Sequence, residues 1–208
     1  MFDRLHQGIV NNLLAMRMMS AGFDTDPTYG ALIDGSRRYY WGISQGGITG
    51  GVYMALSEDV ERGILEVMGQ PYNLLLNRSV DFDPFFTVLH LSFPDPRAQQ
   101  IFLGLVQMSW DRVEPNGYAK YMFTDPFPGS PPHRRVLMRA AIGDHQVSTI
   151  GGQIMARAVG AKHLDTKLRD VYGLEKVTAQ QIDEHGAVYT EYAFGQLPEP
   201  TCNVPLST

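Results

Sequence analysis

The sequence contains few of the residues that build disulfides, metal sites or polyanion-binding surfaces. Cys202 is the one cysteine among 208 residues, which excludes an intramolecular disulfide and a cysteine-built metal site. Only 19% of the residues are charged, and the net charge is -5. An acidic chain of this kind lacks the basic surface that nucleic acids and anionic membranes attract, so we expect neither partner.

Long uninterrupted apolar runs are also missing. The opening segment MFDRLHQGIVNNLLAMRMM carries Asp3, Arg4, His6 and Arg17 among its apolar residues. It therefore resembles neither a signal peptide nor a membrane span, and we expect a cytoplasmic protein. The six histidines show no H-E-x-x-H or comparable spacing, so we expect no metal and no cofactor.

The apolar content, in contrast, is ample: 44% of the residues are hydrophobic and 11% are aromatic. A chain of this length can bury one sizeable core, and we expect a single domain over residues 1–208. Strands are predicted over residues 38–43, 63–69, 135–143 and 187–194, and helices in the opening segment and over 45–56, 97–115 and 148–161. This order predicts an α/β fold with a mostly parallel sheet of about four strands flanked by helices. Residues 70–96 show no sustained period and predict an irregular excursion that could contain short helices and form a cap.

The stretch GISQGG, from Gly42 to Gly47, lies between a predicted strand and a predicted helix. The pattern G-x-S-x-G at such a turn exposes a serine hydroxyl and directs the next backbone N–H toward an oxyanion. Ser44 is therefore a candidate nucleophile, and Gln45 a candidate oxyanion donor. The alternative is that Ser44 only caps the helix. The surrounding glycines favour the nucleophile, because a cap does not require them.

A serine hydroxyl needs a base, which in turn needs a group to orient it. Asp144 follows AAIG at the end of a predicted strand, where a carboxylate could hold a histidine in the useful tautomer. The alternative is an ordinary Gly-Asp turn residue. Three further carboxylates compete with it, each of which could equally be a cap or turn residue: Asp81, Asp83 and Asp111.

Two segments resemble a known superfamily. RRYYWGISQGGITGG resembles the nucleophile elbow of the α/β-hydrolases, and RVLMRAAIGDHQV is similar to the strand that ends at their catalytic acid. YYWGISQGG, RSVDFDPF, WDRVEPNGYA and GDHQV resemble the later half of larger bacterial hydrolase-like proteins. The resemblance implies a reduced α/β-hydrolase fold and a carboxylesterase that forms an acyl-enzyme on Ser44 with short to medium acyl esters. The alternative is a noncatalytic binding or assembly module without a complete triad.

The catalytic histidine is the residue that departs from this pattern. The resemblance places it in a loop after the last strand, but no histidine follows His185. Three sources therefore remain: His145 beside Asp144, His185 ahead of the last predicted strand, or another chain. Adjacent side chains at a strand end tend to diverge, which hinders a direct bond between Asp144 and His145. We place His145 narrowly ahead of His185.

A second departure lies ahead of Ser44. The α/β-hydrolase sheet has strands before the nucleophile strand, whereas only a helix and a loop are predicted here. The nucleophile strand is therefore expected at an edge of the sheet, with unpaired backbone groups and an apolar face exposed. This arrangement predicts self-association that covers the edge, most simply as a symmetric homodimer.

Overall fold

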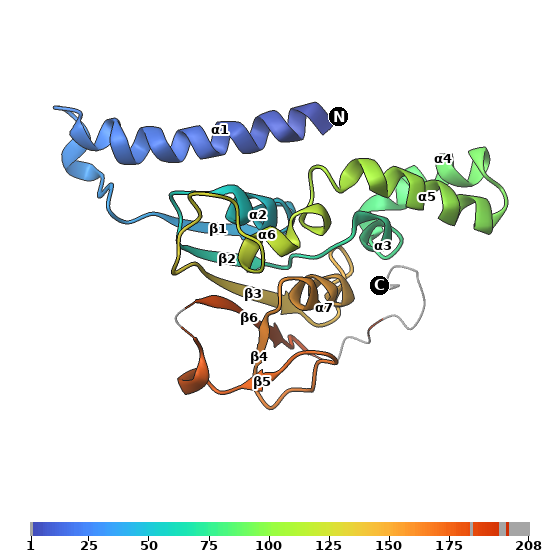
Figure 1. Cartoon of the computed structure of the whole chain (residues 1–208). Helices are drawn as coiled ribbons and strands as arrows, with labels where there is room; N and C mark the ends of the chain where they lie inside the picture. The colour runs from blue at the N-terminus through green and yellow to red at the C-terminus, as the bar shows by residue number, and fades with distance from the viewer. Residues whose placement is uncertain (1, 184, 196–198, 200–208) are drawn as a thin grey trace.

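A computed structural model describes residues 2–183, 185–195 and 199 and shows an α/β fold (Figure 1). Its sheet contains β1 (Tyr39–Ile43), β2 (Arg62–Glu66), β3 (Arg135–Ala141), β4 (Lys162–Leu164), β5 (Lys176–Val177) and β6 (Gly186–Tyr192). The strands lie in the order β1-β2-β3-β6-β4-β5, and every neighbouring pair is parallel. The predicted class is confirmed, and the strand–turn–helix–strand unit forms a parallel pair, β1 and β2, as expected.

The described sheet has six strands, where the sequence predicted about four. The two additional strands are β4, with three residues, and β5, with two. Strands this short do not complete a readable alternation of apolar and polar residues. β4 pairs with β6 and β5 pairs with β4, which extends the sheet on the side away from β1.

The helices are α1 (Phe2–Ala21), α2 (Gln45–Leu56), α3 (Tyr72–Leu76), α4 (Asp83–Ser92), α5 (Pro96–Trp110), α6 (Ala119–Phe123) and α7 (Thr149–Ala158). Short 3-10 turns lie at Phe23–Thr25, Gly30–Leu32, Val80–Phe82, Pro115–Gly117 and Ala179–Gln181. Residues 70–96, predicted as an irregular excursion that could contain short helices, are mostly helical. Ser79 caps the turn before α4 by accepting a hydrogen bond from the Asp81 N–H, and Pro84 occupies the first turn of α4, where its missing N–H costs nothing.

One face of the sheet is covered by helices. α2 packs on β1 and β2, α7 packs on β3, and α6 lies against both helices. Alternate residues of the strands point into this layer, and the core there includes Met54, Leu65, Met138 and Tyr189. Gly50 lets α2 approach closely, since a Cβ there would lie 2.5 Å from the Tyr40 ring.

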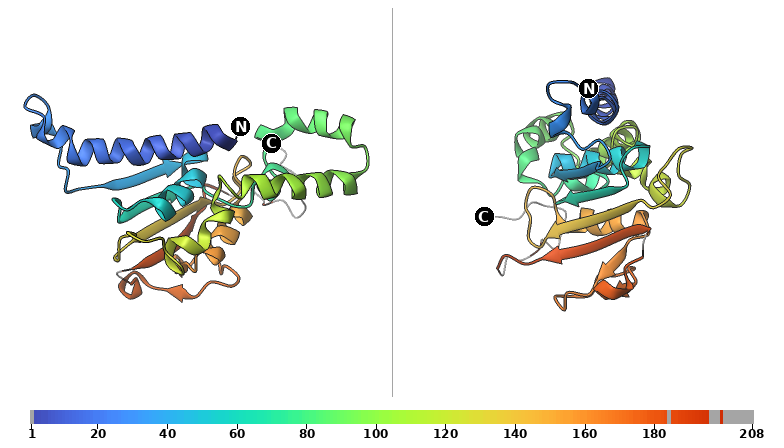
Figure 2. Two further views of the ribbon diagram at one scale, coloured as in Figure 1. Left: turned by 45° about the horizontal axis from the view of Figure 1, so that its top comes forward. Right: turned by 90° about the vertical axis from the view of Figure 1, so that its left-hand side faces the viewer.

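On β1, β2 and β3 the alternate residues that point to the opposite face are more exposed, whereas β6 is buried on both faces over residues 187–191. On β1 they are Tyr39, Trp41 and Ile43, each more than half exposed. Parallel sheets are normally covered on both faces, so this surface is unusual. β1 is an edge strand, as the sequence predicted. α1 lies on the β1 side of the sheet in all three views, and its Leu13 and Met16 pack against the core (Figures 1 and 2).

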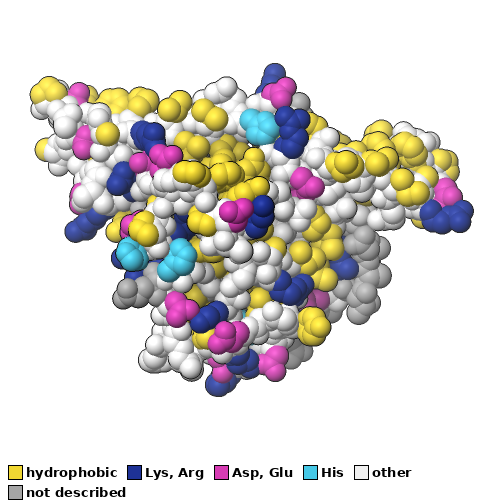
Figure 3. All heavy atoms as spheres, viewed as in Figure 1, with side chains coloured by type: hydrophobic (Ala, Val, Ile, Leu, Met, Phe, Trp, Pro, Cys, Tyr) yellow, Lys and Arg dark blue, Asp and Glu magenta, His cyan; other side chains and the backbone are white. Residues whose placement is uncertain are grey.

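α4 and α5 form a helical hairpin that extends beyond the sheet (Figure 2). Apolar side chains gather over this hairpin and along α1 (Figure 3). The exposed ones include Val10, Leu14 and Met18 on α1, Phe85, Val88 and Leu91 on α4, and Ile101, Leu105 and Met108 on α5. Of the helices within residues 2–183, none combines the length and apolar character needed to cross a membrane.

Candidate functional site

Ser44 occupies a sharp turn between the end of β1 at Ile43 and the start of α2 at Gln45. Its backbone has φ 56° and ψ -122°, a conformation that costs a residue with a side chain roughly 1–3 kcal/mol. The Ser44 N–H donates to the Glu66 carbonyl at 3.0 Å, and the Ser44 carbonyl accepts from the Ile48 N–H at 2.9 Å. Strand pairing on one side and the helix on the other thus hold the strained residue in place.

Close backbone approaches explain two of the three glycines around Ser44. A Cβ on Gly42 would lie 2.2 Å from the Gly46 carbonyl oxygen, and a Cβ on Gly47 would lie 2.2 Å from the Glu66 carbonyl oxygen. Gly46 itself has nothing within 4 Å of its Cβ position. Its carbonyl accepts a hydrogen bond from the Tyr40 hydroxyl at 2.7 Å.

The Ser44 side chain does not act as a helix cap. Ser44 stands at the N-cap position of α2, but its hydroxyl makes no capping hydrogen bond, and the residue is exposed. The N–H of Gln45 belongs to the first turn of α2, where backbone N–H groups lack intrahelical partners and the helix dipole is positive. The Gln45 side chain donates to the Tyr72 hydroxyl and so connects this turn to α3.

Asp144 lies in the loop that follows β3. Because β1, β2 and β3 are parallel, this loop and the Ser44 turn both emerge at the carboxyl edge of the sheet. Asp144 Oδ1 accepts hydrogen bonds from the N–H groups of Gln146 at 2.8 Å and Val147 at 2.9 Å. The carboxylate therefore stabilises its own turn through Oδ1, which is the structural role that the Gly-Asp pair suggested.

A small buried cluster connects the Ser44 turn to the Asp144 loop. It consists of Ile48 from the first turn of α2, Leu75 from α3 and Val147 from the loop, with Tyr72 packed against them. The backbone of His145 is fixed nearby, since its carbonyl accepts from the Val80 N–H at 3.0 Å. The sequence therefore brings the loops of Ser44, Asp144 and His145 to one region of the sheet edge.

The two histidines lie in different places. His145 is half-buried, and in the described part of the chain no hydrogen bond joins its ring to Ser44 or to Asp144. His185 directly precedes Gly186, which pairs with Arg135 at the start of β3. It therefore lies at the amino edge of the sheet, opposite Ser44, with its ring 5.3 Å from that of Phe123. This placement argues against His185 as the alternative base.

Of the three competing carboxylates, Asp81 and Asp83 lie two residues apart at the start of α4, and Asp111 lies at the end of α5. Asp81 accepts from the Gln146 side chain at 3.1 Å and so lies at the Asp144 loop. Asp83 is the first residue of α4. Asp111 accepts from the side chains of Gln107 and Asn116 at the end of α5. Asp83 and Asp111 therefore belong to helix ends, in agreement with their predicted structural roles.

Glu114 is a buried carboxyl that the sequence analysis did not single out. It is 0% exposed, and Oε1 accepts from the Gln107 side chain and, at 3.4 Å, from the Tyr72 N–H. Oε2 has no hydrogen-bond partner. Burial raises the pKa of Glu114 to about 7. Its position in VEPNG carries no apolar pattern that would reveal burial, so only the tertiary contacts of α3 and α5 identify it.

The described residues contain no cluster of three or more His, Cys, Asp or Glu side chains arranged to hold a metal ion. No protein-family model matches the chain, and no curated protein matches its sequence. Among solved structures, it is similar to the crystal structure of acetyl xylan esterase 1 from Thermoanaerobacterium sp. JW/SL YS485, with a TM-score of 0.43 and 16% identity. The match covers 88% of this chain and 47% of the esterase chain, so the chain spans about half the length of that protein.

Proposed function

We propose that the chain is a serine hydrolase that cleaves carboxylic esters through an acyl-enzyme on Ser44. The observation that carries this proposal is the conformation of Ser44, which is exposed, strained and free of any capping bond at a strand-to-helix turn. Such a turn is what a nucleophile elbow requires, because it presents the hydroxyl outward beside the first N–H groups of a helix. A structural cap would have no use for the strain.

In the proposed mechanism, Ser44 Oγ forms a bond to the ester carbonyl carbon while its proton passes to the ring of His145. The developing oxyanion accepts a hydrogen bond from the Gln45 N–H, and a single donor of this kind contributes about 10²–10³ in rate. Asp144 stabilises the imidazolium. The bond between the carbonyl carbon and the alcohol oxygen then breaks as His145 gives its proton to that oxygen. A water molecule next attacks the acyl-enzyme while its proton passes to His145, and His145 gives this proton to Ser44 Oγ as the carboxylic acid leaves.

We propose that the substrate carries an acyl group of short to medium length. The Tyr72 ring meets that of Trp110 edge-on at 5.8 Å and is linked through its hydroxyl to Gln45. Tyr72 thus lies next to the turn, and we propose that its ring provides an apolar wall for the acyl chain.

Ester hydrolysis by purified protein tests the nucleophile. We expect wild type to hydrolyse p-nitrophenyl acetate and butyrate, Ser44→Ala to fall to the background rate, and the exposed Ser92→Ala variant to match wild type. A fluorophosphonate probe should label wild type and Ser92→Ala but not Ser44→Ala, because labelling requires an activated hydroxyl. Labelling that persists in Ser44→Ala would show that another residue reacts.

The base is tested separately. His145→Ala should lower kcat by about 10²-fold or more, in line with the usual contribution of a general base. His133→Ala alters an exposed loop residue and serves as the matched control, with His185→Ala as a second control at the opposite edge of the sheet. Full activity in His145→Ala would exclude it as the base and direct attention to a histidine from another chain.

One observation favours the second candidate, a noncatalytic binding or assembly module. In the described residues, no histidine ring is bonded to Ser44 or Asp144. Under this alternative, wild type and Ser44→Ala would hydrolyse esters equally slowly, and the fluorophosphonate probe would label neither.

We also propose that the chain forms a homodimer through the uncovered face of the sheet. This face presents Tyr39, Trp41 and Ile43 at the β1 edge, where a second copy could cover both the apolar side chains and the edge. An isologous contact of this kind closes after two chains.

A further inference from the structure

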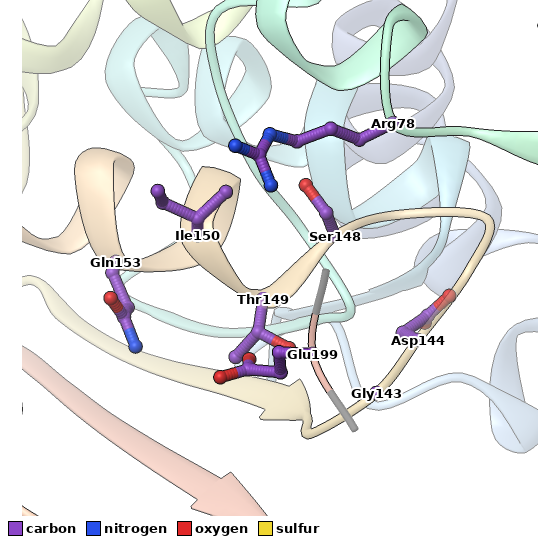
Figure 4. Close-up of a pocket in the computed structure, with 8 residues that line it drawn as sticks. All are labelled: Arg78, Gly143, Asp144, Ser148, Thr149, Ile150, Gln153 and Glu199. Atoms are coloured by element: carbon purple, nitrogen blue, oxygen red, sulfur yellow. The ribbon is translucent and has the colours of Figure 1, made fainter. Parts of the chain in front are cut away.

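A hollow of about 190 Å³ lies beside Asp144, between the loop after β3 and the first turn of α7 (Figure 4). Its polar lining includes Arg78, Asp144, Ser148, Thr149 and Glu199. Water in the liquid occupies about 30 Å³ per molecule, so the hollow has room for a small polyatomic ion. It is separate from the Ser44 turn, which contributes no lining residue.

Ser148 is the most informative residue of this hollow. It is only 4% exposed, yet its Oγ has no hydrogen-bond partner among the described residues. It occupies the N-cap position of α7 without making a capping bond. Figure 4 shows its hydroxyl on the same side of the hollow as the Arg78 guanidinium. Burying a hydroxyl without a partner is unfavourable, so its position points to a ligand that supplies one.

The start of α7 adds further hydrogen-bond donors. α7 has ten residues, and Thr149 and Ile150 are its first two. Backbone N–H groups in a first helical turn have no intrahelical acceptor, and the helix dipole makes this end positive. Such a terminus binds anions, and a neighbouring guanidinium strengthens the preference through charge-assisted hydrogen bonds.

Two carboxylates also line the hollow, and both are engaged elsewhere. Asp144 Oδ1 accepts the N–H groups of Gln146 and Val147. Glu199 pairs with the guanidinium of Arg169, with one of its two contacts at 3.1 Å. Arg169 also pairs with the buried Glu191, so this one cation offsets only part of the negative charge on the acidic side of the hollow.

We propose that this hollow is a binding site for a small oxyanion, either a carboxylate or a phosphate group. The anion is held by the Ser148 hydroxyl, the Arg78 guanidinium and the first N–H groups of α7. Binding gives Ser148 the partner that it lacks and places negative charge at the positive end of the helix. Anion binding requires no reaction at Ser44, although the hollow shares Asp144 with the proposed esterase site.

Calorimetric titration of the purified chain tests this proposal. Inorganic phosphate and sodium acetate are titrated separately, each against a sodium chloride background of matched ionic strength. We expect saturable binding of at least one anion. Ser148→Ala should weaken it several-fold, the usual effect of losing a neutral hydrogen bond, and Arg78→Gln roughly tenfold or more, because that bond is charge-assisted. Phosphate binding alone would identify a tetrahedral anion, and acetate binding alone a carboxylate.

Two exposed residues supply matched controls, Ser92→Ala and Arg97→Gln, which should bind the anion as wild type does. Arg78→Lys keeps the charge and should retain part of the affinity. Circular dichroism melting shows whether each variant is folded, and Ser148→Ala decides the question if Arg78→Gln is not. The proposal is overturned if neither anion binds saturably, or if Ser148→Ala and the folded Arg78 variants bind as tightly as wild type.

Discussion

Ser44 keeps a positive φ because the backbone around it leaves little alternative. Its N–H continues the ladder between β1 and β2, while its carbonyl accepts the first helical bond of α2. Gly47 then passes so close to the Glu66 carbonyl that a side chain cannot fit between α2 and the end of β2. The orientation of the hydroxyl therefore depends on residues that never touch a substrate.

Two neighbouring glycines provide a direct test of this packing. Gly47→Ala should lower the free energy of unfolding by about 2 kcal/mol or more, because its Cβ would overlap the Glu66 carbonyl oxygen. Gly46→Ala meets no atom within 4 Å and should be neutral or stabilise the helix by up to about 1 kcal/mol. Urea denaturation of both variants measures the difference. Equal losses in the two would refute the packing explanation.

Glu114 makes stability depend on pH in a predictable direction. Burial raises its pKa from a usual value near 4.5 to about 7, so the folded state binds a proton more tightly than the unfolded state. The resulting stabilisation is fully present below about pH 4.5 and is lost as pH rises through 7. Its size is on the order of 3 kcal/mol.

Urea midpoints measured from pH 5 to 8 test this assignment. The free energy of unfolding of wild type should fall toward pH 8 as Glu114 ionises. Glu114→Gln cannot ionise, so its stability relative to wild type should increase toward pH 8. Glu175→Gln, at an exposed position, is the matched control and should follow the wild-type curve. A constant difference between Glu114→Gln and wild type across this range would contradict the raised pKa.

At the scale of elements, the sequence predicted the parts whose signals are local. The turn at Ser44 follows from glycine spacing, and the strands near Gly63 and Arg135 are long enough to show buried alternation. β4 and β5 were missed, since two or three residues carry no period and their pairing depends on β6. The helices within residues 70–96 were only weakly signalled, because their apolar residues pack on one another rather than on the sheet.

Arg134 joins the ends of two helices. Its side chain is buried, donating from Nη2 to the Ser57 carbonyl at 2.7 Å and from Nη1 to the Met122 carbonyl at 3.1 Å. These carbonyls lie at the carboxyl ends of α2 and α6, where a cation also interacts favourably with both helix dipoles. The forked guanidinium thus links the end of α6 to the end of α2.

Removing that fork should destabilise the protein more than removing an exposed arginine. Arg134→Met leaves two buried carbonyls without donors and should cost about 2–4 kcal/mol of unfolding free energy. Arg134→Lys should recover only part of this loss, because one ammonium cannot reproduce the two directed bonds. Arg97→Met, whose partner is the exposed Asp95, should change stability by less than about 0.5 kcal/mol. Thermal and urea unfolding provide the comparison.

For the whole molecule, the parallel topology explains how much of the site could be predicted. Ser44 and Asp144 belong to separate sequence motifs that each follow a strand. Because these strands are parallel, both residues lie at the same edge of the sheet. The same rule separates His185 from them, because it precedes a strand instead of following one. Glu114 and Ser148 could not be found in advance, since their burial arises from contacts between elements distant in sequence.

The uncovered face of the sheet leads to a prediction about assembly. Trp41 is 67% exposed even though its indole N–H donates to Glu66 at 2.6 Å, and Ile43 lies beside it on the same face. Apolar side chains on an edge strand favour association with a second copy, so we expect a dimer at about 10 μM in light scattering and sedimentation. Trp41→Lys and Ile43→Lys should shift the protein toward monomer, since a charge buried in the contact is costly.

The matched control for these variants is Tyr172→Lys, which places the same charge at the most exposed large apolar side chain, in the segment before β5. It should leave the dimer intact if the sheet face is the contact. A wild-type protein that stays monomeric over a hundredfold range of concentration would refute the dimer. A dimer that survives Trp41→Lys and Ile43→Lys would instead move the contact to the apolar surfaces of α1 or the α4–α5 hairpin, because these carry the other clusters of exposed apolar side chains.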